Sequence, residues 1–252
     1  EAYIGLETAV GEVRFGTNNS ASLAAHGNAS GQWGTGIGSG YGLTVGSTSS
    51  NTFTRFESTA LYITPSFNGF TARYLTNFKN DSQYGSTTSG TTARRPAISE
   101  FGAQYLNGPL QLNVAMLQSK ASPNESTAAV TNSFTPIPSN INTKTTTISA
   151  SYDLGVARLG ASNSKIRNDA GFDVTNGSTA VAANLTTTAG KTQSVANMLY
   201  AQIPMGQTRI LLSTGNVSVD ASPVPALIGQ KTNVSGIAAE YDLSKRTFVY
   251  AR

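Results

Sequence analysis

Residues 54–76 read TRFESTALYITPSFNGFTARYLT, and two alternating faces can be followed through both halves of this stretch. One face carries Phe56, Ala60 and Tyr62 and then Phe70, Ala72 and Tyr74, while the other carries Arg55, Glu57 and Thr59 and then Thr71 and Arg73. Alternation with a period of two is typical of β-strands, and the residues from Pro65 to Gly69 suit a tight turn. The stretch therefore predicts a β-hairpin with one apolar face and one face that carries arginine.

The composition argues against an ordinary soluble enzyme. Only 12% of the 252 residues are charged, which is roughly half the usual share. The sequence has no cysteine and a single histidine, His26, which excludes disulfides, thiolate catalysis and metal sites built from Cys or His clusters. No apolar run is long enough for a transmembrane helix. The net charge of +4 is not gathered in a run of Lys and Arg that would suit a nucleic acid.

Twelve strand-like runs follow one another in pairs, and each pair is joined by a short turn. The pairs are 2–7 with 12–16, 55–63 with 70–75, 98–105 with 110–117, 146–152 with 156–162, 195–203 with 208–213, and 234–241 with 246–251. Long polar segments separate the pairs, at 17–53, 78–95, 120–143, 166–189 and 217–230. Outer-membrane barrels have short turns on one side of the membrane and long loops on the other. We therefore predict an all-β fold, a transmembrane antiparallel β-barrel, in preference to a soluble sandwich or solenoid.

In a membrane barrel the apolar face of each strand meets lipid and the polar face lines the lumen. This assignment turns Phe56 and Tyr62 toward lipid and Arg55 and Arg73 toward water. Aromatic residues beside the short turns are expected to form a girdle at the membrane boundary, the alternative being ordinary tyrosines near sheet ends; they are Tyr62, Phe67, Phe70, Tyr105, Tyr152, Tyr200 and Tyr241. Helical periodicity is not sustained in any segment, so the pattern predicts no helix.

Five motifs occur in order along the chain: AYIGL (2–6), GEVRFG (11–16), RFESTALYITPSFNGF (55–70), YDLGVA (152–157) and AAEYDLSKRTFVYA (238–251). Together they resemble the general diffusion porins of β-proteobacteria, which include the neisserial porins and the anion-selective porins of comamonad-type bacteria. The resemblance implies a sixteen-stranded, water-filled barrel that assembles as a homotrimer in the outer membrane of a Gram-negative bacterium. Residues 1–252 would then be a single barrel domain without the first strands and the last strand. Residues 17–53 would be the third loop, which folds into the barrel and narrows the pore.

Five arginines are expected on the polar face of the sheet, at Arg14, Arg55, Arg73, Arg158 and Arg209. Adjacent strands lie about 4.8 Å apart, so the first three would form a cationic ladder at the pore constriction. A ring of arginines favours anions. Opposing acidic residues are expected at Glu57 and Glu100, with Glu7, Glu12 and Glu240 as further candidates. The alternative is that the arginines pair with these glutamates and only balance the charge of the wall.

The glycine-rich segment 31–42, GQWGTGIGSGYG, lacks the GK[ST] sequence of a phosphate-binding loop. We expect it to pack inside the lumen as part of the third loop. Trp33 and Tyr41 are then expected to contact the inner wall, the alternative being an aromatic surface that meets the solute. His26 is expected to face water, and no GxSxG motif accompanies it.

The sequence thus predicts a passive outer-membrane pore for small hydrophilic solutes and ions, with a preference for anions and no cofactor. Its expected partners are the solutes, two further copies of the chain, lipopolysaccharide and other outer-membrane lipid, and no nucleic acid. The alternative is a barrel that acts through its external loops as an adhesin or receptor, although such barrels are usually smaller and lack an inserted loop. A barrel enzyme is disfavoured because a Ser-His or Asp-His site would have to use His26.

Overall fold

A computed structural model of the chain describes residues 1–34, 36, 38–41, 55–78, 97–120, 142–168, 192–221 and 225–252. In these residues twelve antiparallel strands form one sheet, and each strand pairs with its neighbours in sequence. The strands are β1 (Ala2–Thr8), β2 (Gly11–Asn19), β3 (Arg55–Ile63), β4 (Phe70–Asn77), β5 (Ala97–Asn107), β6 (Leu110–Lys120), β7 (Asn142–Asp153), β8 (Arg158–Asn168), β9 (Thr192–Met205), β10 (Thr208–Ala221), β11 (Lys231–Ser244) and β12 (Thr247–Ala251). The helical elements are α1 (Ala21–Ser30) and the 3-10 helices η1 (Gly31–Trp33) and η4 (Pro225–Leu227).

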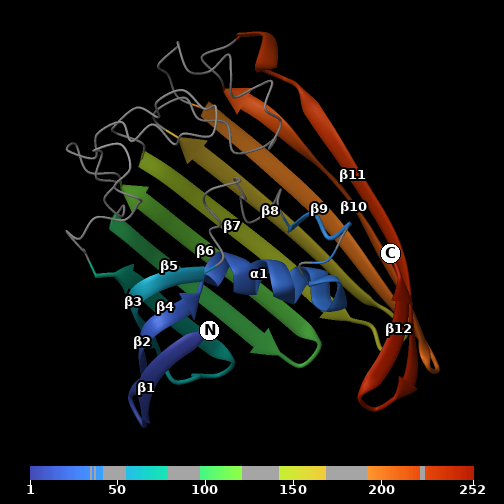
Figure 1. Ribbon diagram of the computed structural model, residues 1–252, viewed down its shortest axis with the longest axis horizontal. Helices are drawn as coiled ribbons and strands as arrows, with labels where there is room; N and C mark the ends of the chain where they lie inside the picture. The colour runs from blue at the N-terminus through green and yellow to red at the C-terminus, as the bar shows by residue number, and fades with distance from the viewer. Residues whose placement is uncertain are drawn as a thin grey trace, which may run out of the picture.

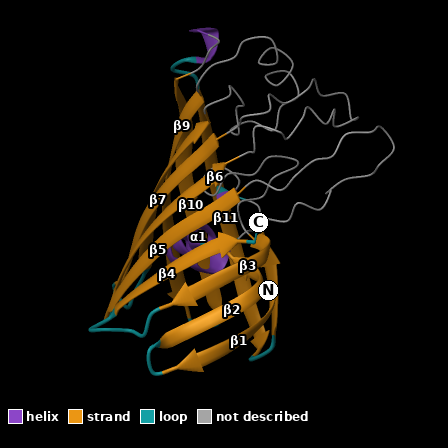
Figure 2. Ribbon diagram, turned by 90° about the vertical axis from the view of Figure 1, so that its left-hand side faces the viewer, coloured by secondary structure: helices purple, strands orange, loops and turns teal. Residues whose placement is uncertain are grey.

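The sheet curves into a barrel wall that surrounds α1, and β1 and β12 form its two edges (Figures 1 and 2). The side that faces α1 is the lumen. All twelve predicted strands are confirmed, and the six predicted pairs are joined by short turns at one end of the wall. None of the helices in the described segments has the length and hydropathy needed to cross a membrane.

The short turns contain the residues that their backbone requires. Asn68 and Gly69 have φ angles of 48° and 84°, and Gly108, Gly155 and Gly206 have φ angles of 56°, 79° and 65°. These angles lie in the left-handed region, where glycine and asparagine are tolerated and most other residues are strained. The turns therefore fix where each strand pair reverses, and hence which residues point outward.

The outer face of the wall is apolar, as predicted. On β6 and β7, Met116 and Ile148 are 53% and 56% exposed, whereas the alternating residues Asn113 and Ser149 are buried on the lumen side. A soluble protein rarely exposes a continuous apolar surface of this kind, whereas the outside of a membrane barrel requires one.

Two face assignments from the sequence are wrong. Phe56 does not point outward; it is buried on the lumen side in a cluster with Leu61 and Leu75. Ser58 has a φ of 53°, and the β2–β3 register shifts between Gly16 and Asn18. Such a bulge inserts an extra residue, so the alternation reverses on either side of it.

Tyr200 is the second wrong assignment, because it is not part of the aromatic girdle. It is 4% exposed and lies on the lumen side of β9, where its hydroxyl donates to the carbonyl oxygen of Ser39 at 2.9 Å. Tyr62, Phe67, Phe70, Tyr152 and Tyr241 are exposed near the short turns, as the girdle requires.

Helix α1 was not predicted. It begins after Ser20, whose side chain accepts a hydrogen bond from the amide of Leu23, and it ends at Gly31, which has a φ of 59°. Both features are ordinary helix caps. Its wall-facing side is made of small residues, among them Ala21, Ala25 and Ala29.

The wall also provides space for α1 to approach closely. A Cβ atom added to Gly102 on β5 would lie 2.5 Å from the Cβ of Ala21, and one added to Gly160 on β8 would lie 2.0 Å from the carbonyl oxygen of Ala29. Both distances are too short for non-bonded atoms, so these two glycines let the helix lie directly against the strands.

Candidate pore-constriction site

The segment that enters the lumen consists of α1, η1 and residues 38–41, and we call it the inserted segment. Its first helix lies against β5 to β9. Residues 42–54, which complete the predicted third loop, lie outside the described residues. Strand β2 continues through Asn19, so the inserted segment leaves the wall at Ser20.

The N-terminus of α1 is held by Glu100 of β5. One carboxylate oxygen accepts from the backbone amide of Ala21 at 2.6 Å, and the other accepts from the amide and the hydroxyl of Ser22, each at 3.0 Å. The first amides of a helix have no partner within the helix, and the helix dipole favours a negative charge there. Glu100 is 1% exposed and lies beneath α1, so it is not open to the pore.

The C-terminus of α1 is held by basic and amide side chains. Arg158 of β8 donates to the carbonyl oxygen of Asn28, and Gln202 of β9 donates to that of Ser30 at 3.0 Å. The last carbonyl groups of a helix also lack partners, and the dipole favours a positive charge there. Arg158 is therefore engaged with the inserted segment and also donates to Ser151 at 2.8 Å.

Beyond α1, Trp33 fixes the inserted segment to β9, β10 and β11. It is 1% exposed, packs with Met198, Leu211 and Ala238, and donates from its indole Nε1 to the carbonyl oxygen of Leu212 at 3.2 Å. The expectation that Trp33 contacts the inner wall is what the structure shows.

His26 lies in the same packed layer, contrary to the expectation that it faces water. Its side chain is 0% exposed, its Nε2 lies 2.8 Å from the carbonyl oxygen of Gly34, and its ring makes edge-to-face contacts with Tyr41 and Tyr200. Burial lowers the pKa of His26, and the hydrogen bond to Gly34 only partly opposes that shift. Tyr41 is partly buried, and burial raises its pKa.

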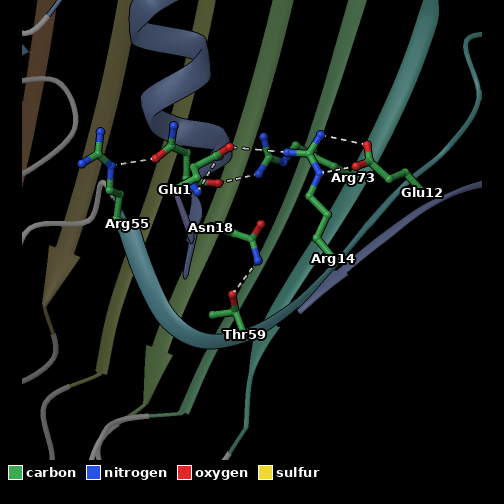
Figure 3. Close-up of polar contacts among 8 residues, drawn as sticks. Glu1, Glu12, Arg14, Asn18, Arg55, Thr59 and Arg73 are labelled. Carbon is green, nitrogen blue, oxygen red and sulfur yellow. Dashed lines mark hydrogen bonds and ion pairs between the residues drawn. The ribbon is translucent and has the colours of Figure 1, made fainter. Parts of the chain in front are cut away.

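Arg14, Arg55 and Arg73 lie in one row beside the start of the inserted segment (Figure 3). Arg73 donates to the carbonyl oxygen of Asn19 at 2.5 Å, and Arg55 donates to the Oδ1 atom of Asn19 at 2.9 Å. The structure therefore brings together the three arginines that were predicted to form a ladder, with Asn19 between two of them.

One arginine of this row forms ion pairs, and the charges of Glu100 and Glu1 also act on Arg73. Arg14 forms ion pairs with Glu12 at 2.6 Å and with Glu1 at 3.5 Å, and its guanidinium stacks over the ring of Tyr3 at 4.5 Å. Neither Arg55 nor Arg73 forms an ion pair with a residue of the described segments. The Nε atom of Arg73 is buried without a hydrogen-bond partner in the same segments.

Arg209 lies apart from this row, on β10. It forms an ion pair with Asp242 at 2.8 Å and with Glu240 at 3.3 Å, and Glu240 also pairs with Arg252 at 3.0 Å. The second expected acidic residue, Glu57, is exposed on β3. The expected glutamates thus do not form one wall: Glu100 anchors α1, Glu12 pairs with Arg14, and Glu240 pairs with two arginines.

Sequence reasoning missed Asn19, Asp242 and Arg252, which complete these contacts. Asp242 carries a usable signal, because it lies two residues after Glu240 on β11. Arg252 follows the last residue of β12 and has no cross-strand partner in the register of β11 and β12. Asn19 carries none, since its position depends on the bulge in β3. No cluster of three or more potential metal-binding residues occurs in the described part of the chain.

Comparison with known proteins agrees with this architecture. The profile of the Gram-negative porin family matches residues 1–252. The chain belongs to this family, which places it in the bacterial outer membrane. No curated protein gave a significant match to the sequence.

Solved structures share the fold at low sequence identity. An anion-selective porin from Comamonas acidovorans is 20% identical with a TM-score of 0.65, over 98% of this chain and 64% of that one. OmpT of Vibrio cholerae is 17% identical with a TM-score of 0.67, over 98% and 66%. OmpF of Salmonella typhi, in complex with daunomycin, is 14% identical with a TM-score of 0.65, over 99% and 68%. The chain thus spans less than two thirds of the Comamonas porin.

Replacing Glu100 with Gln should loosen the inserted segment without unfolding the barrel. The amide keeps one acceptor but loses the charge and one hydrogen bond at the α1 N-terminus, a loss of about 1–3 kcal/mol. Trp33 is the single tryptophan of the sequence, so its fluorescence reports the packing of this segment. We expect its emission to shift to the red at a lower temperature in E100Q, while the far-UV circular dichroism of the strands is unchanged.

The matched control is Glu7→Gln, which removes the same charge from an exposed position on β1. The Trp33 transition should stay at its wild-type temperature in this variant. An unchanged transition in E100Q would contradict the anchoring role of Glu100.

Acid should weaken the packing of the inserted segment through His26. Because burial lowers the pKa of His26, the packed segment favours the neutral ring, and the released segment binds a proton more readily. Packing is thus at full strength above the ordinary histidine value of about 6.5. It weakens as the pH falls below that value, and stops changing below the pKa of packed His26. We expect the temperature of the Trp33 transition to fall over this pH range.

His26→Gln is the control, because Gln can still donate to Gly34 but does not titrate. Its Trp33 transition should be independent of pH in this range. An equal pH dependence in the variant would assign the effect to another group.

Proposed function

We propose that the protein is an outer-membrane diffusion channel for small hydrophilic solutes and ions. The observation that carries this proposal is a helix held inside a barrel wall at both ends, by Glu100 and Arg158. Such a helix narrows the lumen but does not fill it. Helix α1 lies against β5 to β9, whereas the arginine row lies on β2 to β4. An adhesin or receptor that works through its external loops has no need of this element.

We further propose that the channel prefers anions. Arg55 is exposed and donates to a neutral amide, and neither it nor Arg73 has an ion-pair partner in the described segments. Residues 17–51, which include the inserted segment, contain no Asp or Glu. The constriction therefore has cationic groups on the wall and no negative charge on the segment beside it. Such an arrangement lowers the energy of an anion that passes. The anion-selective porin from Comamonas acidovorans has the same fold.

The proposed assembly is a homotrimer with its outer face in contact with lipopolysaccharide and other outer-membrane lipid. We expect neither catalysis nor nucleic-acid binding. The single histidine of the sequence is used in packing, and the arginines of the lumen are spread over separate strands that form a wall.

Conductance tests the proposal directly. Protein reconstituted into planar bilayers should open in groups of three equal steps, and its reversal potential in a KCl gradient should show a preference for chloride. A protein that inserts but conducts no current would refute the channel. A preference for potassium would refute only the role of the arginines.

Arg55→Ala should reduce the chloride preference. A unit charge about 8 Å from an ion in water contributes about 0.5 kcal/mol, with opposite sign for chloride and for potassium, so we expect the ratio of chloride to potassium permeability to fall about sixfold. Arg246→Ala is the matched control, because Arg246 is an exposed arginine in the short turn between β11 and β12. Its ratio should equal that of the wild type. Equal ratios in all three proteins would show that Arg55 does not select ions.

A further inference from the structure

Asn19 lies where β2 ends and the inserted segment begins. Its backbone is held on both sides, because its amide donates to Oε1 of Glu1 at 3.0 Å and its carbonyl oxygen accepts from Arg73 at 2.5 Å. The next residue, Ser20, caps α1. The backbone of Asn19 is therefore fixed by the wall and by the start of the helix, and its side chain has a defined origin.

The side chain of Asn19 holds Arg55. The two residues are direct cross-strand partners of β2 and β3, and Nε of Arg55 donates to Oδ1 of Asn19 at 2.9 Å. Side chains of directly opposite residues lie close enough to interact. An arginine side chain that has no such partner samples many rotamers. The hydrogen bond thus ties the guanidinium of Arg55 to the place where the inserted segment leaves the wall.

Arg55 differs from the other predicted lumen arginines in its exposure and in the charge of its partner. Arg14 and Arg209 are paired with carboxylates. Arg73 and Arg158 donate to neutral acceptors but are partly buried. Among these five arginines of the described chain, Arg55 alone is exposed and hydrogen-bonded to a neutral side chain. The amide of Asn19 leaves the positive charge of Arg55 whole, whereas a carboxylate at the same place would cancel it for a passing ion.

The charge of Arg55 acts on the inserted segment. Burial raises the pKa of Tyr41 in that segment, and the positive charge of Arg55 partly opposes the rise. A charge in salt solution acts over about 8 Å at physiological ionic strength. Arg55 therefore lies within electrostatic reach of the part of the lumen that the inserted segment narrows.

We propose that Asn19 determines the anion preference of the channel, because it positions Arg55 beside the inserted segment and leaves the charge of Arg55 uncompensated. Asn19 is a positioning residue, since it acts on the ion through Arg55. An amide suits this role because its oxygen accepts a hydrogen bond as a carboxylate oxygen does, but without a charge. The inference rests on the proposed anion preference and names the residue that controls it.

Two substitutions of Asn19 separate the position of Arg55 from its charge. Asn19→Asp keeps the shape and the acceptor but adds a negative charge opposite Arg55, so the ratio of chloride to potassium permeability should fall about sixfold, as in R55A. Asn19→Ala keeps the charge of Arg55 and removes its acceptor. A guanidinium that moves from about 8 Å to about 12 Å from the ion path should lower the ratio about twofold. The measurement is the reversal potential of the reconstituted protein in a KCl gradient.

The double variant N19A/R55A shows whether Asn19 acts through Arg55. Its permeability ratio should equal that of R55A, because no guanidinium is left to position. A ratio that falls further in the double variant would overturn the proposal. The Trp33 transition should stay at its wild-type temperature in N19D and N19A. A lower transition in N19D would assign the change in selectivity to release of the inserted segment and would also overturn the proposal.

The matched control is Asn107→Asp, which makes the same change at the exposed end of β5, beside a short turn. Its permeability ratio should equal that of the wild type. Equal ratios in the wild type, N19D and N19A would refute the role of Asn19, while a chloride preference of the wild type would still support the selective channel. A wild type that conducts no current would refute the channel itself, and the role of Asn19 with it.

Discussion

The carboxylate of Glu100 against the first amides of α1 is the contact on which the rest of the lumen depends. A helix inside a barrel needs hydrogen-bond partners from the protein for the free amides at its N-terminus and the free carbonyls at its C-terminus. Glu100 does so at one end, and Arg158 and Gln202 do so at the other. Their charges match the helix dipole, so the orientation of α1 and its two ends are fixed by the same residues. The position of Trp33 and the layer around His26 follow from that orientation.

Alternation predicted the strands and most of their faces because the outer surface has a single requirement, which is to be apolar. The assignment of faces was wrong where the lumen side of a strand is also apolar and buried. Met198 and Tyr200 of β9 are buried on the lumen side, because the inserted segment covers them there. Apolar residues on both faces leave no alternation to read. Phe56 is a different case, in which one bulged residue reverses the pattern.

The positions of the lumen arginines could be predicted, but their partners could not. Arg14 and Arg73 follow from period-two counting along β2 and β4. Arg55 does not, because it precedes the bulge in β3 that also reverses Phe56. Whether each arginine has a carboxylate partner depends on the register between strands, on the bulge in β3, and on the direction of α1. The sequence pattern predicts none of these three features. Helix α1 itself lacks the apolar stripe that predicts helices, because its packed side meets small and polar residues of the wall such as Gly102, Gly160 and Ser149.

The two wall glycines have a consequence for the width of the channel. At Gly102 and Gly160 the helix already lies against backbone, with no space for even a methyl group between them. The lumen beside α1 is thus as wide as this helix allows. A side chain at either position would push the helix away from the wall and toward the solute path. Substitutions at these two glycines therefore make the channel narrower and never wider.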